Sequence, residues 1–248
     1  MEDIKKITTL CLLAGKIMMK SGAETYRVED TMSRMAAAFG MTDSECFVTP
    51  TGIIFSLNGE EPTKLIRLKE RATDLRKVTI VNDISRKISS REMTADTALQ
   101  KLKELEQTNL AYPVWLQLAA ASVASGCFLI MFYGRWSDFL PAVITGLLGF
   151  AGFLYAHRIV AIKFFAEFLA SLIVGFFASL LVSTGIGAEL DKIIISSIMP
   201  LVPGLLITNA IRDLMAGQLV SGLSKGADSF LTAFAIGTGI AVALTVFP

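Results

Sequence analysis

The chain has 248 residues, of which 53% are hydrophobic, and it carries 23 Lys and Arg residues against 22 Asp and Glu residues. This near-neutral balance lacks the basic excess typical of nucleic-acid-binding proteins, so no nucleic acid is expected as a partner. The charges are unevenly distributed, because residues 1–112 hold 17 basic and 16 acidic residues whereas residues 113–248 hold 6 of each. Long apolar runs with few charges are typical of membrane spans. We therefore expect a soluble domain at 1–112 and a transmembrane domain at 113–248.

The soluble part has the pattern of a small α+β domain. Apolar residues at helical spacing predict helices at 4–20, 24–39, 75–90 and 95–107. Short runs rich in β-branched and aromatic residues predict strands at 46–49, 53–57 and 63–71. Four helices around a small antiparallel sheet supply enough apolar surface for one core.

Charged residues crowd the start of the second predicted helix. Glu24, Arg27 and Glu29 follow Gly22 within a few residues. Acidic side chains are stabilised near a helix N-terminus by the free backbone amides and the helix dipole, and Arg27 is spaced to pair with Glu24. That explanation needs no ligand. The alternative is that Gly22, Glu24, Arg27 and Glu29 form a gate or a regulatory site.

The soluble part contains no recognisable catalytic or cofactor-binding motif. The one histidine, His157, lies in the membrane part, and residues 1–112 hold no Gly-x-Ser-x-Gly motif and no phosphate-binding glycine loop. Cys11, Cys46 and Cys127 lack the spacing of metal ligands and are expected to be small buried hydrophobic residues. We therefore expect no catalytic residue, no metal site and no cofactor.

Five transmembrane spans are predicted in the second part. They lie at about 113–133, 139–156, 164–184, 193–211 and 230–247. The second span carries Gly146, Gly149 and Gly152, which form a small-residue face suited to close helix contact. Residues 212–228 are less apolar and are expected to form a short amphipathic helix, with Asp228 as the N-terminal cap of the last span.

The distribution of basic residues predicts the orientation in the bilayer. The loops after the second and fourth spans hold more Lys and Arg than the loops after the first and third, and Arg212 and Lys225 are among them. Basic loops stay in the cytoplasm. We therefore expect a cytoplasmic N-terminal domain, and a C-terminus on the outer side of the membrane.

The fourth span is interrupted in the sequence Met199-Pro200-Leu201-Val202-Pro203-Gly204. Each proline removes a backbone donor and crowds the preceding turn, and Gly204 adds conformational freedom. In hydrocarbon, the freed carbonyls must be buried in protein or line a wet cavity. Interrupted helices of this kind hold polar substrates and ions in secondary transporters. A plain proline kink that only shapes packing is the alternative.

If the interruption is a binding site, polar residues after it are candidates for contacting the substrate. Half-helix amides would bind a carboxylate, Asn209 or carbonyls would bind an ammonium group or a cation, and Arg212 would add a guanidinium fork. A solvated pair of loop residues is the alternative for Arg212 and Asp213. The full candidate set is Pro200, Pro203, Gly204, Thr208, Asn209, Arg212 and Asp213.

Three motifs together resemble the threonine/serine exporter (ThrE-type) family, and they are most similar to the larger subunit of its split form. The motifs are Ser21-Gly22-Ala23-Glu24-Thr25-Tyr26-Arg27-Val28-Glu29, Phe47-Val48-Thr49-Pro50-Thr51-Gly52 and Pro200-Leu201-Val202-Pro203-Gly204. The resemblance covers nearly the whole chain. It implies a multi-pass exporter of small polar metabolites in a bacterial inner membrane. Threonine and serine are the namesake substrates, and some split members are linked instead to small dicarboxylates such as succinate.

The resemblance also bears on partners. Fused members of the family carry about twice as many spans as the five expected here, which implies that a smaller membrane subunit or further copies of this chain complete the transporter. The expected partners are therefore that subunit or copy, the lipid bilayer and a small-molecule substrate. The N-terminal domain of such proteins has been likened to hydrolases, but no nucleophile–base pair is evident in this sequence.

Three interpretations of function stay open at this point. The first is an exporter driven by an ion gradient. The second is a membrane-anchored, hydrolase-like enzyme or sensor that acts through the N-terminal domain. The third is an accessory subunit that only stabilises a transporting partner.

Overall fold

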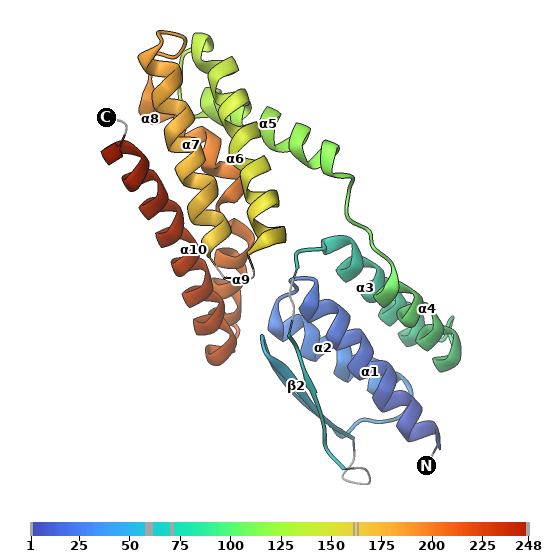
Figure 1. Cartoon of the computed structure of the whole chain (residues 1–248). Coiled ribbons are helices and arrows are strands. Elements are labelled where there is room, and N and C mark those ends of the chain that lie inside the picture. Colours follow the sequence, from blue (N-terminus) through green and yellow to red (C-terminus); the bar gives the residue numbers. More distant parts are fainter. Residues whose placement is uncertain (1, 58–61, 70–71, 161, 163, 247–248) are drawn as a thin grey trace. The chain divides into compact units, whose positions relative to one another are not determined.

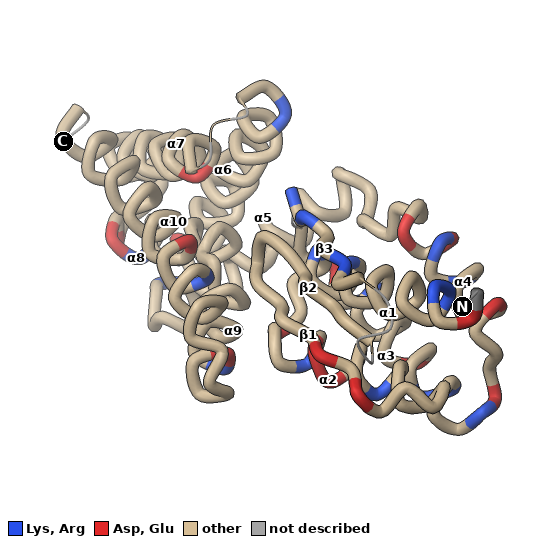
Figure 2. Tube along the Cα trace, turned by 90° about the horizontal axis from the view of Figure 1, so that it is seen from below, with Lys and Arg blue, Asp and Glu red and all other residues tan. Residues whose placement is uncertain are grey.

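The computed structural model describes every residue except 1, 58–61, 70–71, 161, 163 and 247–248. The chain forms two compact units: the first comprises Met1–Ala111 and Leu205–Ala227, and the second comprises Tyr112–Gly204 and Asp228–Pro248. The segment Leu205–Ala227, which was expected within the membrane part, thus packs with the N-terminal elements. Figure 2 shows charged residues at high density along α1–α4 and at low density along α5–α7.

The first unit contains a three-stranded antiparallel sheet and four N-terminal helices (Figure 1). The helices are α1 (Glu2–Lys20), α2 (Thr25–Ala38), α3 (Leu75–Ser89) and α4 (Ala95–Gln107). The strands, in the order β1-β2-β3, are β1 (Ser44–Thr49), β2 (Gly52–Leu57) and β3 (Lys64–Arg67). All of the predicted helices and strands in this region are present. The third strand is shorter than predicted, and residues 70–71 of the prediction lie outside the described part.

Alternation along the strands places one face of the sheet in the core. Ile53, Phe55 and Leu57 are buried whereas Ile54 is exposed, as the two-residue period of a strand requires. These side chains belong to the same buried cluster as Met18 from α1 and Met32 from α2. One continuous hydrophobic core therefore joins the sheet to the helices.

The second unit is built from long apolar helices. Among the described residues, four helices are long and apolar enough to cross a membrane, or five if Leu190–Leu201 and Gly204–Met215 are counted as one broken span. The elements are α5 (Val114–Met131), η1 (Trp136–Asp138), α6 (Phe139–Ile159), α7 (Phe165–Ser183), α8 (Leu190–Ile198), η2 (Met199–Leu201) and the part of α10 (Leu219–Val246) from Asp228 onward. The chain is thus a mostly helical membrane protein with a small sheet.

Glycines allow these helices to approach closely, as predicted for the second span. A Cβ atom on Gly146 would lie 2.1 Å from Oγ of Ser125 on α5, and one on Gly149 would lie 2.3 Å from a methyl group of Val174 on α7. Such distances are too short for real Cβ atoms. The small-residue face of α6 therefore packs against two neighbouring helices.

The end of α9 (Gly204–Met215) and the start of α10 differ from prediction. Gly217 adopts φ +82°, and the amides of Gly217 and Gln218 donate to the carbonyls of Leu214 and Asp213. This pattern is a Schellman motif, which ends α9. Then α10 runs unbroken from Leu219 to Val246. No separate amphipathic helix forms at 212–228, and Asp228 lies inside α10 rather than at its N-terminal cap.

Candidate functional site

The predicted interruption after α8 is present in the backbone. The helix α8 ends at Ile198, η2 forms one 3-10 turn around Pro200, and Val202 is extended before α9 begins at Gly204. Pro200 also borders a pocket of about 440 Å³ in the second unit. The pocket is lined mainly by apolar side chains, namely Tyr112, Leu116, Gln117, Ala120, Ala121, Phe150 and Pro200.

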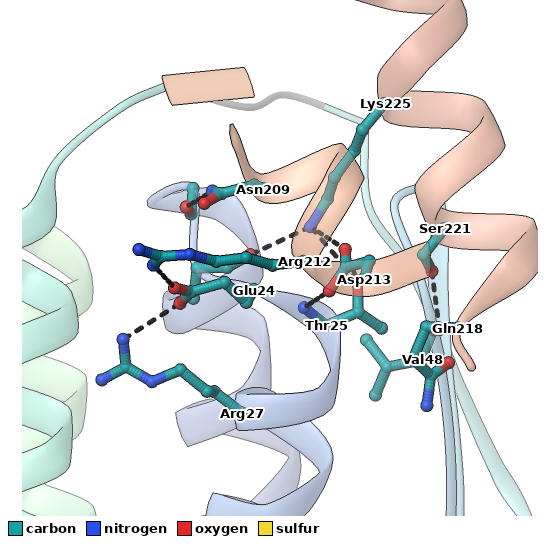
Figure 3. A network of polar contacts seen from close by, with 12 residues as sticks. Glu24, Thr25, Arg27, Val48, Asn209, Arg212, Asp213, Gln218, Ser221 and Lys225 are labelled. Carbon is teal, nitrogen blue, oxygen red and sulfur yellow. Dashed lines mark hydrogen bonds and ion pairs between the residues drawn. The ribbon is translucent and has the colours of Figure 1, made fainter. Parts of the chain in front are cut away.

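A buried ion pair lies in the first unit. Asp213 on α9 and Lys225 on α10 are 0% and 5% exposed, and Lys225 Nζ lies 2.7 Å from the Asp213 carboxylate (Figure 3). The same carboxylate accepts hydrogen bonds from the amide and the hydroxyl of Thr25, at 2.8 and 2.9 Å. Lys225 also donates to the carbonyl of Ala23 at 3.1 Å. Asp213 therefore satisfies a free amide at the N-terminus of α2 while its charge is balanced by Lys225.

The loop between α1 and α2 has a shape that makes these contacts possible. Gly22 adopts φ +85° just after α1, and the amides of Gly22 and Ala23 donate to the carbonyls of Met19 and Met18. This Schellman motif ends α1 and requires a residue that tolerates the left-handed conformation. The carbonyl of Gly22 then accepts a hydrogen bond of 2.8 Å from the side chain of Asn209 on α9.

Glu24 lies at the N-cap position of α2 but makes no side-chain capping bond. Its two carboxylate oxygens are instead bonded by Arg212 at 2.7 Å and by Arg27 at 3.0 Å (Figure 3). The pairing of Glu24 with Arg27 that the sequence predicted is confirmed. Burial alone would raise the pKa of Glu24, but its own backbone amide, Arg212 and Arg27 outweigh that effect and hold the pKa below its ordinary value.

Glu29, one turn further along α2, connects the sheet to the start of α10. Its carboxylate accepts a hydrogen bond of 2.9 Å from the amide of Val48 in β1, and another from the side-chain amide of Gln218. Ser221 on α10 donates to the carbonyl of Val48 at 3.2 Å. Burial raises the pKa of Glu29, and the charge of Asp213 adds to this effect, against the lowering by Val48 and Gln218.

These contacts form one polar network, which joins residues 22–29 to residues 209–225 within the first unit. It contains seven of the residues that the sequence singled out: Gly22, Glu24, Arg27, Glu29, Asn209, Arg212 and Asp213. Because Asp213 is fully buried in a helix, it is not part of a solvated loop pair. Thr208 is exposed. Pro200, Pro203 and Gly204 belong to the second unit.

Sequence reasoning missed four members of the network, which are Thr25, Gln218, Ser221 and Lys225. Lys225 was counted as a loop charge, but it is buried inside α10. A lysine in a mostly apolar helix is costly without a partner, so its position was a usable signal. The other three are common polar residues whose sequence context carries no such signal.

Two cysteines of the first unit are poor nucleophiles. Burial raises the pKa of Cys11 and of Cys46 to about 12, so both thiols are protonated at neutral pH and neither is an activated nucleophile. Within the described part of the chain, no group of three or more His, Cys, Asp or Glu residues is placed to hold a metal ion. The network can, in contrast, present exposed guanidinium groups to an anion.

Comparison with known proteins supports the resemblance seen in the motifs. The chain is 24% identical to the "Probable succinate transporter subunit YjjP" of Escherichia coli (strain K12), over 99% of this chain and 96% of the relative. It is 26% identical to the "Probable threonine/serine exporter" of Mycobacterium tuberculosis and 23% identical to the "Threonine/serine exporter" of Corynebacterium glutamicum. Those matches cover 97% and 98% of this chain but only 46% and 52% of the relatives. The chain therefore spans about half the length of these two exporters.

No solved structure matches the chain. The family described as "Putative threonine/serine exporter" matches residues 9–247, which is nearly the entire sequence. The chain belongs to the threonine/serine exporter family.

Proposed function

We propose that the chain is the larger subunit of a multi-subunit exporter in a bacterial inner membrane, and that its substrates are small polar metabolites that carry a carboxylate. Family membership and the apolar helices support export across a membrane. The names of the relatives point to amino acids of the threonine and serine type or to small dicarboxylates such as succinate. Both substrate classes share the carboxylate group.

The observation that carries this proposal is the pair of half-exposed arginines in the polar network. Arg27 and Arg212 are the kind of side chain that binds carboxylates by charge and by paired hydrogen bonds. The interruption at Pro200–Gly204 breaks the regular helix between α8 and α9, as happens in the discontinuous helices of secondary transporters. We propose that Pro200, Pro203, Gly204, Thr208, Asn209, Arg212 and Asp213 contribute to the substrate path. Gly22, Glu24, Arg27 and Glu29 act as its gate.

The remaining features of the proposal concern assembly and energy. An ion gradient drives export, since the sequence has no nucleotide-binding motif. The N-terminal elements lie in the cytoplasm and the C-terminus lies outside. A smaller membrane subunit, or a second copy of this chain, completes the transporter, which agrees with the word "subunit" in the name of one relative and with the half-length matches to two others.

A counterflow assay tests the proposal. Membrane vesicles that contain the chain, with and without a candidate smaller subunit, are loaded with unlabelled L-threonine, L-serine or succinate and are then given the labelled compound outside. Accumulation above that of vesicles lacking the chain supports export. A rate equal to that of empty vesicles, for all three compounds and with the candidate subunit present, would contradict it. Exchange by the candidate subunit alone, unchanged by this chain, would instead favour an accessory role.

A substitution in the same assay separates transport from a purely anchoring role. Asp213→Asn keeps the shape of the side chain but leaves the charge of Lys225 unbalanced. We expect counterflow to fall to the background while immunoblotting detects the variant in the membrane at a comparable amount. Counterflow at the wild-type rate would remove Asp213 from the proposed site.

A further inference from the structure

Glu24 has an unusual environment for a carboxylate at a helix start. Its side chain is 6% exposed, whereas its two partners, Arg27 and Arg212, are 43% and 56% exposed. Each arginine bonds a different oxygen of the carboxylate, and each uses its Nη1 atom to do so. One buried carboxylate thus holds together two guanidinium groups that are open to solvent.

The two arginines have more charge and more donors than Glu24 satisfies. A guanidinium group carries five N–H donors, so most donors of Arg27 and Arg212 are left for other acceptors. Among the described residues, Glu24 is the only carboxylate that pairs with either of them. Arg34 on the same helix provides a contrast, because it forms an ordinary exposed i, i+4 pair with Asp30.

The buried carboxylate of Asp213 does not offset this positive charge. Asp213 lies at the N-terminus of α2, but its charge is taken up by Lys225 at 2.7 Å and by the Thr25 amide. The N-terminal end of α2 adds the positive end of a helix dipole. The surroundings of Glu24 therefore attract anions from solution.

We propose that Arg27 and Arg212 form a carboxylate-binding site, and that Glu24 is a built-in competitor which a ligand carboxylate replaces. This inference rests on the proposed function and names the groups that recognise its substrate. The ligand class is a small monocarboxylate or dicarboxylate, since each of the two arginines can form two parallel N–H···O bonds to a carboxylate. Because Arg27 lies on α2 and Arg212 on α9, replacement of Glu24 removes one of the bonds between these helices. Ligand binding is thereby coupled to the contact between α2 and α9.

The competitor role has a direct consequence for affinity. While Glu24 occupies the site, a ligand carboxylate cannot bind there. The apparent affinity for the ligand is therefore reduced in proportion to the fraction of time that the site is free of Glu24. Glu24→Gln keeps a hydrogen-bond acceptor but removes the charge that competes. The dissociation constant for a carboxylate should therefore fall, by about tenfold.

Binding to the purified full chain in lipid nanodiscs tests the inference. The probes are succinate, L-threonine and L-threonine amide, which lacks the carboxylate. We expect Glu24→Gln to lower the Kd for succinate and threonine. Arg27→Gln and Arg212→Gln should each raise the Kd by at least about tenfold. Arg34→Gln, on the same helix, should leave the Kd unchanged, and the amide should bind to none of these proteins.

A measurement on the unaltered chain avoids any folding defect of the variants. Phenylglyoxal modifies accessible arginine side chains, and mass spectrometry locates the modified residues. Succinate should protect Arg27 and Arg212 but not Arg34. Equal modification with and without succinate would overturn the inference, as would a Glu24→Gln chain that is folded but binds succinate no more tightly than wild type.

The two proposals fail in distinguishable ways. Counterflow by wild type that persists in Arg27→Gln and Arg212→Gln would overturn this inference and leave the exporter proposal standing. Protection of both arginines by succinate, without counterflow by any combination of subunits, would support the site and contradict export.

Discussion

Asp213 and Lys225 show what a buried ion pair contributes to the first unit. Both side chains are removed from water, and their attraction offsets that cost only while both are present. Asp213→Leu or Lys225→Met alone should therefore cost about 3–5 kcal/mol. The double variant should be less destabilised than the sum of the single variants, because neither charge is then left unpaired. Thermal unfolding of the full chain in detergent measures these effects, and strictly additive losses would show that the pair is not coupled.

Glu24 and Glu29 on α2 should respond to pH in opposite directions. The pKa of Glu29 is raised, chiefly by burial, so its contribution to folding is complete below its unfolded value of 4.5 and is lost as pH rises through the folded value. Glu29→Gln should therefore raise Tm at neutral pH, while it still accepts the hydrogen bond from Val48. The pKa of Glu24 is lowered, so its contribution is present above 4.5 and is lost as pH falls. Glu24→Gln should therefore lower Tm at neutral pH.

Tm measured from acidic to neutral pH in both variants checks these signs. At pH 7, the Tm of Glu29→Gln should lie above that of wild type, and the Tm of Glu24→Gln should lie below it. If both variants shift Tm in the same direction, then burial and ion pairing do not control these carboxyl groups as described.

At the scale of single residues, the sequence could predict local pairs but not distant ones. Arg27 is three positions from Glu24, so helical spacing was sufficient to predict their contact. The bonds of Thr25 to Asp213 and of Arg212 to Glu24 each cross 188 positions. No periodic pattern in a sequence indicates a contact at that separation, so the partners of Thr25 and Arg212 became visible only in the structure.

At the scale of elements, helix packing in the second unit gives a prediction with a matched control. A Cβ atom on Gly239 of α10 would lie 2.4 Å from the carbonyl oxygen of Phe168 and 2.1 Å from Oγ of Ser171 on α7. Backbone atoms cannot move aside cheaply, so Gly239→Ala should lower stability by about 1–3 kcal/mol. Gly237→Ala meets open space on the same helix and should be neutral or slightly stabilising. A Gly239→Ala protein that unfolds at the wild-type temperature would contradict this packing.

Elements were predicted well where periodicity was uninterrupted. The helices and strands of the first 111 residues have clear two-residue or 3.6-residue spacing, and apart from the shorter β3 they lie close to their predicted bounds. The start of α10 was assigned to a separate amphipathic helix at 212–228, because Ser221, Ser224, Lys225 and Asp228 make residues 219–228 less apolar than the rest of α10. Two polar side chains near the start of α10 bond to other elements of the first unit. Ser221 donates to β1, and Lys225 donates to the loop before α2.

At the scale of the whole molecule, the first unit is built from two distant parts of the sequence. Leu205–Ala227 contributes Asp213, Gln218 and Lys225 to the network that holds residues 22–29. A fragment that ends at residue 111 would lack these partners and would leave the N-terminus of α2 without its buried acceptor. Tests of activity in this unit therefore require the full chain.

The family was predictable from the sequence because its motifs are short and lie in order along the chain. The composition of the first unit was not predictable, since residues 21–29, 47–52 and 205–227 are far apart in the sequence and join one unit only in the folded chain. The structure places two of the three motifs in the first unit and the Pro200–Gly204 motif in the second. Candidate site residues could therefore be predicted one by one from the sequence, but which of them lie together could not.

The most direct test of the account compares two arginine variants in the counterflow assay. Arg212→Ala removes an arm of the proposed carboxylate site, whereas Arg34→Ala removes an exposed arginine that pairs only with Asp30 among the described residues. At equal amounts of protein in the vesicles, exchange of labelled succinate and L-threonine should fall to background in Arg212→Ala and stay near the wild-type rate in Arg34→Ala. Wild-type exchange by Arg212→Ala would contradict the account.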